Sequence, residues 1–244
     1  MLFRSNRSFR LRARGRDYVL RVPGPGTERF ISRAAEAANL AAAVAAGVAP
    51  PLVRSYASGV QLSVFVDESR ALAPEDLRQP AVLAEVAFLL RRLHECEAAF
   101  QGAIEPLAVV DRYLALAPHP ELARLRRAVE ASTAPTPAEE RRPCHGDPVA
   151  ANLLASPRGI VLIDWEYSCM AEPAWDLAVL ALDAELGPTH ERLLLAAYGR
   201  PELVERVEAA KPLVRLVSAA WANAALAAGS TAPRLSALVA AAGT

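Results

Sequence analysis

Residues 144–152 read Cys-His-Gly-Asp-Pro-Val-Ala-Ala-Asn, and residues 163–167 read Ile-Asp-Trp-Glu-Tyr. Between the two stretches, a turn signal at residues 156–158 precedes the compact apolar run 159–163. Such a run predicts a buried strand, which here ends on Asp164. We therefore expect a loop, a turn and a strand in this segment, with acidic side chains on the loop and at the end of the strand.

The spacing of the polar residues in this segment is that of a phosphoryl-transfer site. Transfer needs a carboxylate beside the acceptor hydroxyl and oxygen ligands that hold Mg²⁺ against the nucleotide phosphates. The pattern H-x-D-x-x-x-x-N followed by a strand-borne Asp supplies these groups, and His145, Asp147, Asn152 and Asp164 match it. Pro148 disfavours helix at Asp147, so a loop presents this side chain. We expect Asp147 to accept the proton of the substrate hydroxyl, and Asn152 and Asp164 to bind Mg²⁺.

The amino-terminal quarter of the chain has the pattern of a small antiparallel sheet with one helix. Two alternating runs within residues 8–22 predict a β-hairpin, and two more, at residues 52–56 and 60–66, predict further strands. An alanine-rich stretch between them predicts a helix that Ser32 caps and that ends near Gly47. We expect a strand-rich lobe over residues 1–68.

Residues 69–244 are expected to form a mainly helical second lobe. Apolar residues recur at helical spacing from about residue 80 to residue 97 and predict one amphipathic helix. The fold class predicted from these patterns is α+β. Further helices are expected at residues 106–116, 121–129, 173–186, 191–198 and 202–228.

The composition limits the classes of partner. Lys+Arg and Asp+Glu are equal at 27 each, so no overall field attracts nucleic acid or an anionic membrane. The apolar stretch 37–53 is mostly alanine and is interrupted by glycine and proline, which excludes it as a membrane span. Three cysteines without metal-ligand spacing favour buried thiols in a reducing cytoplasm. Lys211 is the only lysine, so a role that lysine usually fills must belong to another residue.

The string Cys-His-Gly-Asp-Pro-Val-Ala-Ala-Asn-Leu-Leu, followed by Ile-Asp-Trp-Glu-Tyr-Ser, resembles the choline/ethanolamine kinase family. This family belongs to the aminoglycoside phosphotransferase-like superfamily, and the likeness is to bacterial choline kinases. It continues through Ala-Trp-Asp-Leu-Ala at residues 174–178 and reaches the amino-terminal strand at residues 18–24. The resemblance covers almost the whole chain, and its most specific part is residues 144–176.

The resemblance implies a protein-kinase-like fold of two lobes, ATP and Mg²⁺ as cofactors, and phosphorylation of an alcohol on a small cationic molecule. Arg21 then stands where protein kinases have a lysine, and it would hold the phosphates and pair with Glu36. A guanidinium is permanently charged and binds phosphate with two parallel hydrogen bonds, so the exchange is chemically workable. His145 and Asp176 would support the catalytic loop without reacting.

The amino-terminal end departs from the family pattern. Residues 2–9 stand where relatives have a glycine-containing loop over the phosphates, but both glycines are missing. Ser5 and Asn6 would contact the nucleotide there, in an amino-terminal lobe that is expected to be truncated at its start. Without glycine the backbone approaches phosphates less closely. A pseudokinase-like module that binds nucleotide or amine without turnover is therefore the alternative.

The expected substrate is an amino alcohol, with choline or ethanolamine foremost. A quaternary ammonium donates no hydrogen bonds and is recognised by aromatic faces and carboxylates. The resemblance assigns this role to Tyr167 and Trp221, and Glu166 would contact the substrate or the metal. Trp165 and Trp175 are expected in the core. Thiamine and aminoglycosides remain alternative substrates, although the neutral chain disfavours a polycation, and the oligomeric state is open.

Overall fold

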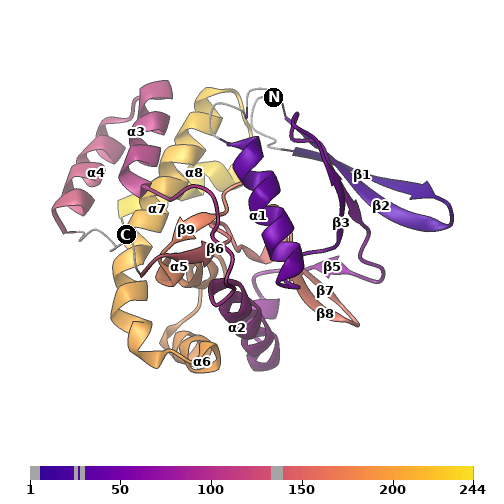
Figure 1. The fold of residues 1–244 in the computed structure, drawn as a ribbon. Coiled ribbons are helices and arrows are strands. Elements are labelled where there is room, and N and C mark those ends of the chain that lie inside the picture. Colours follow the sequence, from indigo (N-terminus) through magenta and orange to yellow (C-terminus); the bar gives the residue numbers. More distant parts are fainter. Residues whose placement is uncertain (1–5, 25–26, 28–30, 133–139, 244) are drawn as a thin grey trace.

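A four-stranded antiparallel sheet begins the chain in the computed structural model, which describes residues 6–24, 27, 31–132 and 140–243. Its first two strands form the expected hairpin, which projects from the body of the molecule (Figure 1). Both residues of the connecting turn, Arg14 and Gly15, have positive φ, which matches the twist of a two-residue hairpin loop. In sheet order the strands are β1 (Asn6–Ala13), β2 (Arg16–Pro23), β4 (Gln61–Val64) and β3 (Leu52–Ser55).

One helix, α1 (Arg33–Ala45), lies between this sheet and the rest of the molecule (Figure 1). The hydroxyl of Ser32 accepts a hydrogen bond from the backbone N–H of Ala35 at 3.3 Å, as the sequence predicted for the cap. The boundary expected at residue 68 falls in the turn after β4. The division into lobes at that point stays a prediction.

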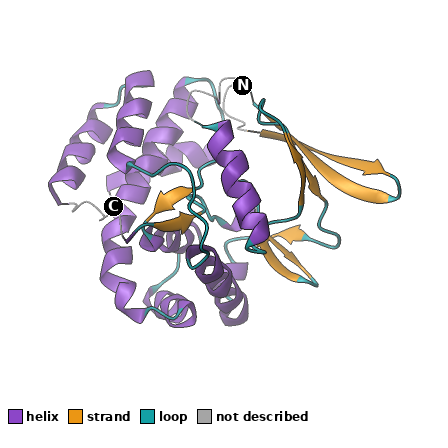
Figure 2. Cartoon of the chain, in the orientation of Figure 1, coloured by secondary structure: helices purple, strands orange, loops and turns teal. Residues whose placement is uncertain are grey.

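The remaining elements are mainly helical, and Figure 2 shows that the helices gather on the side opposite the sheet. Two small antiparallel sheets, in the orders β5-β7-β8 and β6-β9, lie next to these helices. The helices are α2 (Pro80–His94), α3 (Pro106–Leu116), α4 (Pro120–Ser132), α5 (Pro173–Asp183), α6 (Pro188–Tyr198), α7 (Val204–Ala227) and α8 (Pro233–Ala240). The short strands are β5 (Arg70–Ala71), β6 (Arg142–Cys144), β7 (Leu153–Ser156), β8 (Gly159–Leu162) and β9 (Cys169–Ala171).

The α+β class is confirmed. The helix expected at residues 106–116 has these bounds in the structure, and the strand expected at 159–163 is β8. Sequence reasoning missed β5, β6, β9 and α8. The first three are two or three residues long, so they depend on a distant partner and not on a local pattern.

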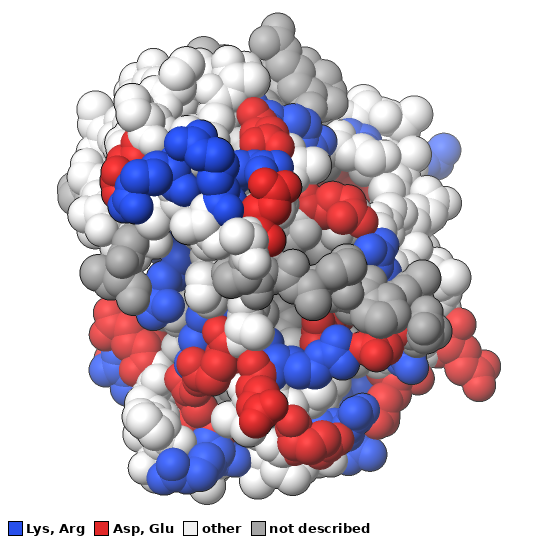
Figure 3. Space-filling view, turned by 90° about the vertical axis from the view of Figure 1, so that its left-hand side faces the viewer, with Lys and Arg blue, Asp and Glu red and all other residues white. Residues whose placement is uncertain are grey.

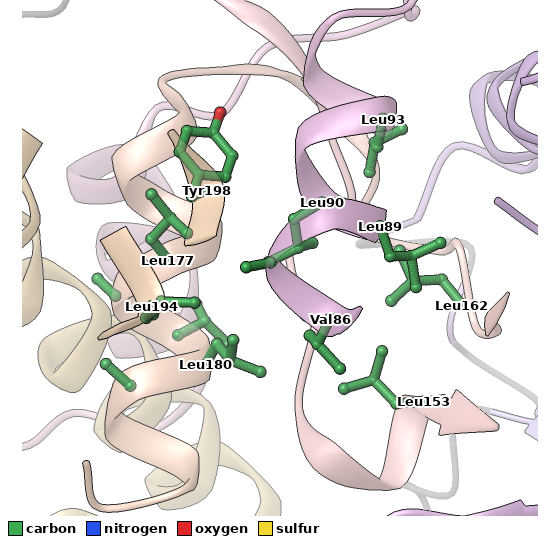
Figure 4. Packing of buried hydrophobic residues seen from close by; sticks show 14 of the residues in the cluster. Val86, Leu89, Leu90, Leu93, Leu153, Leu162, Leu177, Leu180, Leu194 and Tyr198 are labelled. Carbon is green, nitrogen blue, oxygen red and sulfur yellow. The ribbon is translucent and has the colours of Figure 1, made fainter. Parts of the chain in front are cut away.

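Helix α2 is the centre of the hydrophobic core (Figure 4). Leu90 points toward α5 and α6, whereas Val86 and Leu89 point toward β7 and β8. Helix α2 therefore packs both against these helices and against the hairpin of β7 and β8, which lies between Asn152 and Asp164 in the sequence. Trp165 and Trp175 are 2% and 6% exposed, as expected for core residues.

Charged residues of both signs are interspersed on the face that carries α3 and α4 (Figure 3). Arg126, for example, lies 2.9 Å from Asp111 on the neighbouring helix. Lys211 on α7 is enclosed by Glu191 at 2.8 Å and Glu208 at 2.6 Å. Within the described part of the chain, no helix combines the length and apolarity that crossing a membrane requires.

Candidate active site

Asp176 fixes the loop that carries Asp147. This carboxylate is 0% exposed and accepts hydrogen bonds from the backbone N–H groups of His145 at 2.8 Å and Gly146 at 2.9 Å. His94 Nε2 lies 3.1 Å from the same carboxylate. Such buried bonds are costly to break, because they would leave a charge without partners. Asp176 is thereby in contact with the loop backbone and not with the cavity, which is the supporting position expected for it.

The loop also crosses the turn after β8 at very short range. Gly146 has φ +85°, and a Cβ built on it would lie 2.4 Å from the backbone oxygen of Tyr167. A side chain at this position is therefore excluded. His145 Nε2 contacts the carbonyl of Ile163 at 2.9 Å, and Trp175 donates to the carbonyl of Gly146 at 3.0 Å. The two acidic stretches seen in the sequence are thus joined by backbone contacts.

Asp147 and Asn152 lie at the two ends of one tight loop. Asn152 Nδ2 donates to the backbone oxygen of Asp147 at 2.9 Å and to its carboxylate at 3.3 Å. The backbone N–H of Ala150, between them, donates to Asp183 on α5 at 2.8 Å. With Nδ2 of Asn152 engaged in this way, its oxygen Oδ1 is the atom that remains to ligate a cation.

The pKa of Asp147 is raised from 3.8 to about 7. Burial is the main cause, and the negative charges of Asp164 and Asp183 add to it, whereas Arg234 acts in the opposite direction. A carboxylate with a pKa near neutrality is suited to accept a proton in a reaction at neutral pH.

Asp164 has a left-handed backbone conformation, with φ +67°, which is uncommon for a residue that is not glycine. Its carboxylate forms an ion pair with Arg21 and accepts a hydrogen bond from Asn6 Nδ2 at 3.3 Å. Strain of this kind is typical of functional positions. The side chain joins the strand-end turn to the amino-terminal sheet.

Arg21 and Glu36 form an ion pair, as the resemblance implied. Burial opposes the positive charge of Arg21, but the carboxylates of Asp164, Glu36 and Glu166 raise its pKa above that of an ordinary arginine. The guanidinium therefore contacts three carboxylates. Ser5, the other residue expected at the nucleotide, lies outside the described residues.

Two buried polar atoms beside Arg21 lack a hydrogen-bond partner among the residues that the structure describes. They are Asn6 Oδ1 and Gln61 Nε2. Unpaired buried polar atoms are uncommon and call for a further ligand. The donor set fits nucleotide and Mg²⁺, since the carboxylate of Asp164 and the amide oxygen of Asn152 are hard ligands lining one cavity.

Glu166 borders the same cavity as Tyr167 and Trp221, and its side-chain contacts are with the amino-terminal part of the chain. Its side chain is 3% exposed and contacts Asn6 at 2.8 Å, Arg21 at 3.2 Å and Arg33 at 3.5 Å. These partners come from the amino-terminal sheet and from α1. Glu166 thus contacts two arginines, and its expected role toward substrate or metal stays a prediction.

A cavity of about 940 Å³ connects these groups with the helical lobe. It lies within the range of small-molecule sites. Its lining comes from α1, from Asp147, Asn152 and Asp164, and from α7 and α8. Tyr167 and Trp221 both border this cavity, so the expected aromatic residues and the expected base share one space.

Sequence reasoning missed several residues of this cavity. Tyr113 on α3 is buried, its hydroxyl is hydrogen-bonded to Tyr167, and its pKa is raised to about 12, mainly by burial. No local signal marks it, because only the tertiary fold brings α3 to the site. Asp183 carries a signal: it lies seven residues after Asp176 on α5, so both share one helix face. Arg33, next to the cap of α1, was also missed; it contacts Glu36 and Glu166, which border the cavity.

Comparison with known proteins gives a consistent result. The model of the phosphotransferase enzyme family matches residues 4–211. Protein LicA of Haemophilus influenzae is 30% identical over 204 residues, which are 80% of this chain and 76% of that protein.

Solved structures share the fold. The choline kinase LicA from Streptococcus pneumoniae superposes with a TM-score of 0.82 at 24% identity, over 96% of this chain and 88% of that chain. A choline/ethanolamine kinase family protein from Mesorhizobium loti superposes with a TM-score of 0.77 at 27% identity, over 96% of this chain and 84% of that chain. The match to the family model and the similarity to these kinases show that the chain belongs to the phosphotransferase enzyme family and is a small-molecule kinase.

Proposed function

We propose that this kinase transfers the γ-phosphoryl group of ATP to the hydroxyl of a small amino alcohol, with choline as the first candidate and ethanolamine as the second. The observation that carries the proposal is the shared cavity, in which Asp147 lies with the aromatic side chains of Tyr113, Tyr167 and Trp221. Aromatic faces attract a cation that has no N–H to donate, at about 0.5–2 kcal/mol each.

Carboxylates complement the aromatic residues at this end of the cavity. Asp183 borders it beside Asp147, and both carry negative charge into a largely apolar space when ionised. A single positive charge on the substrate offsets their repulsion. The similarity to a choline kinase and to choline/ethanolamine kinase family proteins supports the same class of substrate.

A polycationic antibiotic is a poorer fit. Three arginines, Arg112, Arg215 and Arg234, border the same cavity. Each would repel a substrate with several ammonium groups. Five carboxylates of the described residues border the cavity as well. Three of them, Glu36, Asp164 and Glu166, pair with Arg21, and Asp183 lies 3.8 Å from Arg234. Few carboxylates therefore remain to bind several ammonium groups.

The proposed chemistry assigns one step to each part of the site. Asp147 accepts the proton of the substrate hydroxyl while the hydroxyl oxygen forms a bond to the γ-phosphorus. The bond between the γ-phosphorus and the bridging oxygen of the β-phosphate breaks, and ADP is released. Asn152 and Asp164 would hold Mg²⁺, which neutralises phosphate charge when bound. Arg21 would hold the phosphates. Because ATP is the phosphoryl donor, we propose that the protein works in the cytoplasm.

The test is an ADP-release assay with choline, ethanolamine, thiamine and an aminoglycoside, each with the wild type and with Asp147→Asn. We expect turnover with choline or ethanolamine that the substitution abolishes. If no substrate gives turnover that depends on Asp147, while Mg²⁺ and ATP still bind, the kinase proposal fails. The pseudokinase-like alternative would then describe the protein.

A further inference from the structure

Two arginines, and not one, serve the carboxylates on the nucleotide side of the site. Glu36 is 1% exposed, and its two oxygens have different partners. Oε1 pairs with Arg21, whereas Oε2 lies 2.6 Å from Nη1 of Arg33. The same Nη1 lies 3.5 Å from Glu166, which also contacts Arg21. Arg33 and Arg21 therefore both bridge Glu36, on α1, and Glu166, in the turn after β8.

The Arg33 side chain is held in this place on every side. Its Nη2 donates to the hydroxyl of Thr27 at 2.6 Å, and that hydroxyl donates to the carbonyl of Gly24 at 2.8 Å. Its aliphatic stem runs over Gly59, where an added Cβ would lie 2.6 Å from Arg33 Cδ. The chain leaves room for this arginine and directs its charge toward the carboxylates.

The number of charges shows why a second arginine matters. Three carboxylates, those of Glu36, Asp164 and Glu166, meet two guanidiniums. Both terminal nitrogens of Arg21 already contact carboxylates. Nη1 of Arg21 pairs with Glu36, whereas Nη2 contacts Asp164 and Glu166. If Nη2 turns to phosphate without a substitute, Glu166 keeps a buried negative charge with fewer partners, which is unfavourable.

We propose that Arg33 is a positioning residue for nucleotide binding: it helps to neutralise Glu36 and Glu166, so that Arg21 keeps its pair with Glu36 and turns its other terminal nitrogen to the phosphates. The inference rests on the proposed use of ATP. Arg33 acts through Arg21 and does not itself touch the nucleotide. Asp164, the third carboxylate, is the one that Mg²⁺ would take over.

The decisive experiment measures two quantities for each variant: the affinity for Mg²⁺ with ATP by titration calorimetry, and KM for ATP and for the amine by steady-state kinetics. We expect Arg33→Gln to weaken ATP binding about tenfold and to leave KM for the amine unchanged. Arg33→Lys should recover only part of the loss. Its ammonium keeps the positive charge, but it contacts two carboxylates at once less well than the planar guanidinium does. The matched control is Arg54→Gln, an arginine that lies over Tyr56 on the sheet.

The double variant Arg33→Gln with Glu166→Gln distinguishes a role of Arg33 in positioning Arg21 from a purely structural role in the fold. If Arg33 frees Arg21 by neutralising Glu166, removal of that charge should restore most of the ATP affinity. If Arg33 only braces the structure, the two losses should add. Unchanged ATP affinity in Arg33→Gln, or additive losses in the double variant, would overturn the proposal. Failure of the wild type to bind ATP would instead overturn the proposed function.

Discussion

The two sides of the active site are held by different kinds of contact. On the catalytic side, Asp176 binds backbone N–H groups of the loop, and Gly146 lies directly against the carbonyl of Tyr167. On the nucleotide side, Arg21 and Arg33 reach the carboxylates through long side chains. Backbone contacts of the first kind leave few alternative arrangements, whereas arginine side chains can exchange partners.

This difference fits the two tasks. A base must be placed accurately against the hydroxyl before reaction, because misplacement by an ångström costs much of the rate. Phosphate-binding groups must instead exchange protein carboxylates for ligand oxygens. The following predictions test whether the catalytic side is rigid and whether its chemistry is separate from binding.

The largest effect is expected from Asp147→Asn. The amide keeps the shape of the side chain but cannot accept the proton, so kcat should fall about a thousandfold. Affinity for ATP should change little, since the nucleotide side is held by other residues. Steady-state kinetics and calorimetry measure the two quantities. An unchanged kcat would show that Asp147 is not the base.

The second largest effect is expected from Asp176→Asn, which should destabilise the loop that carries Asp147. The substitution removes the charge that His145 and Gly146 share, so the free energy of unfolding should drop by about 3 kcal/mol. Urea denaturation measures this change. Asp111→Asn, which affects a surface ion pair with Arg126, is the matched control and should cost less than about 1 kcal/mol. Equal losses would mean that the loop is not held through Asp176.

The pH dependence sharpens the assignment of the base. With a pKa of about 7 in the free protein, Asp147 is mostly protonated at pH 6 and mostly ionised at pH 8, so kcat/KM should rise about tenfold over that interval. The folded protein binds this proton more tightly than the unfolded chain. The contribution of Asp147 to stability therefore falls as pH rises from about 4 to 7.

Profiles of kcat/KM against pH test the kinetic part, and urea denaturation at several pH values tests the stability part. In Asp147→Asn, the part of the pH dependence of the free energy of unfolding that comes from Asp147 should be absent. A value of kcat/KM that is constant between pH 6 and pH 8 would contradict the raised pKa.

The smallest effect is expected at the substrate end of the cavity. Trp221→Ala should raise KM for choline by about 2-fold to 30-fold, which corresponds to one cation–π contact. KM for ATP should stay unchanged. Phe88→Ala, at an exposed position on α2, is the control for loss of an aromatic ring. An effect on ATP and not on choline would place Trp221 on the wrong side of the site.

Local patterns predicted much of this fold. The cap at Ser32, the apolar periodicity of α2 and the turn before β8 each depend on neighbours in sequence, and the structure has these elements where they were expected. Asp147 and Asn152 lie in one short loop, so their closeness in space could likewise be predicted from their spacing in the sequence. Their chemical roles stay predictions until the variants are measured.

What could not be predicted depends on contacts between distant segments. Strand β6 exists because its backbone pairs with that of β9 in a sheet of two strands, and no local pattern shows that pairing. Tyr113 reaches the cavity only because α3 packs against α7. The position of Glu166 among the arginines also depends on where the sheet meets the helical part of the molecule.

The use of arginine in place of lysine has a practical consequence for chemical labelling. Reagents that acylate a primary amine, including electrophilic nucleotide analogues directed at the lysine of other kinases, have no lysine to modify beside the nucleotide. The only lysine of the chain, Lys211, lies on α7 between two glutamates. A probe for this cleft would need guanidinium-selective chemistry, such as a dicarbonyl group, and Arg21 would be its target.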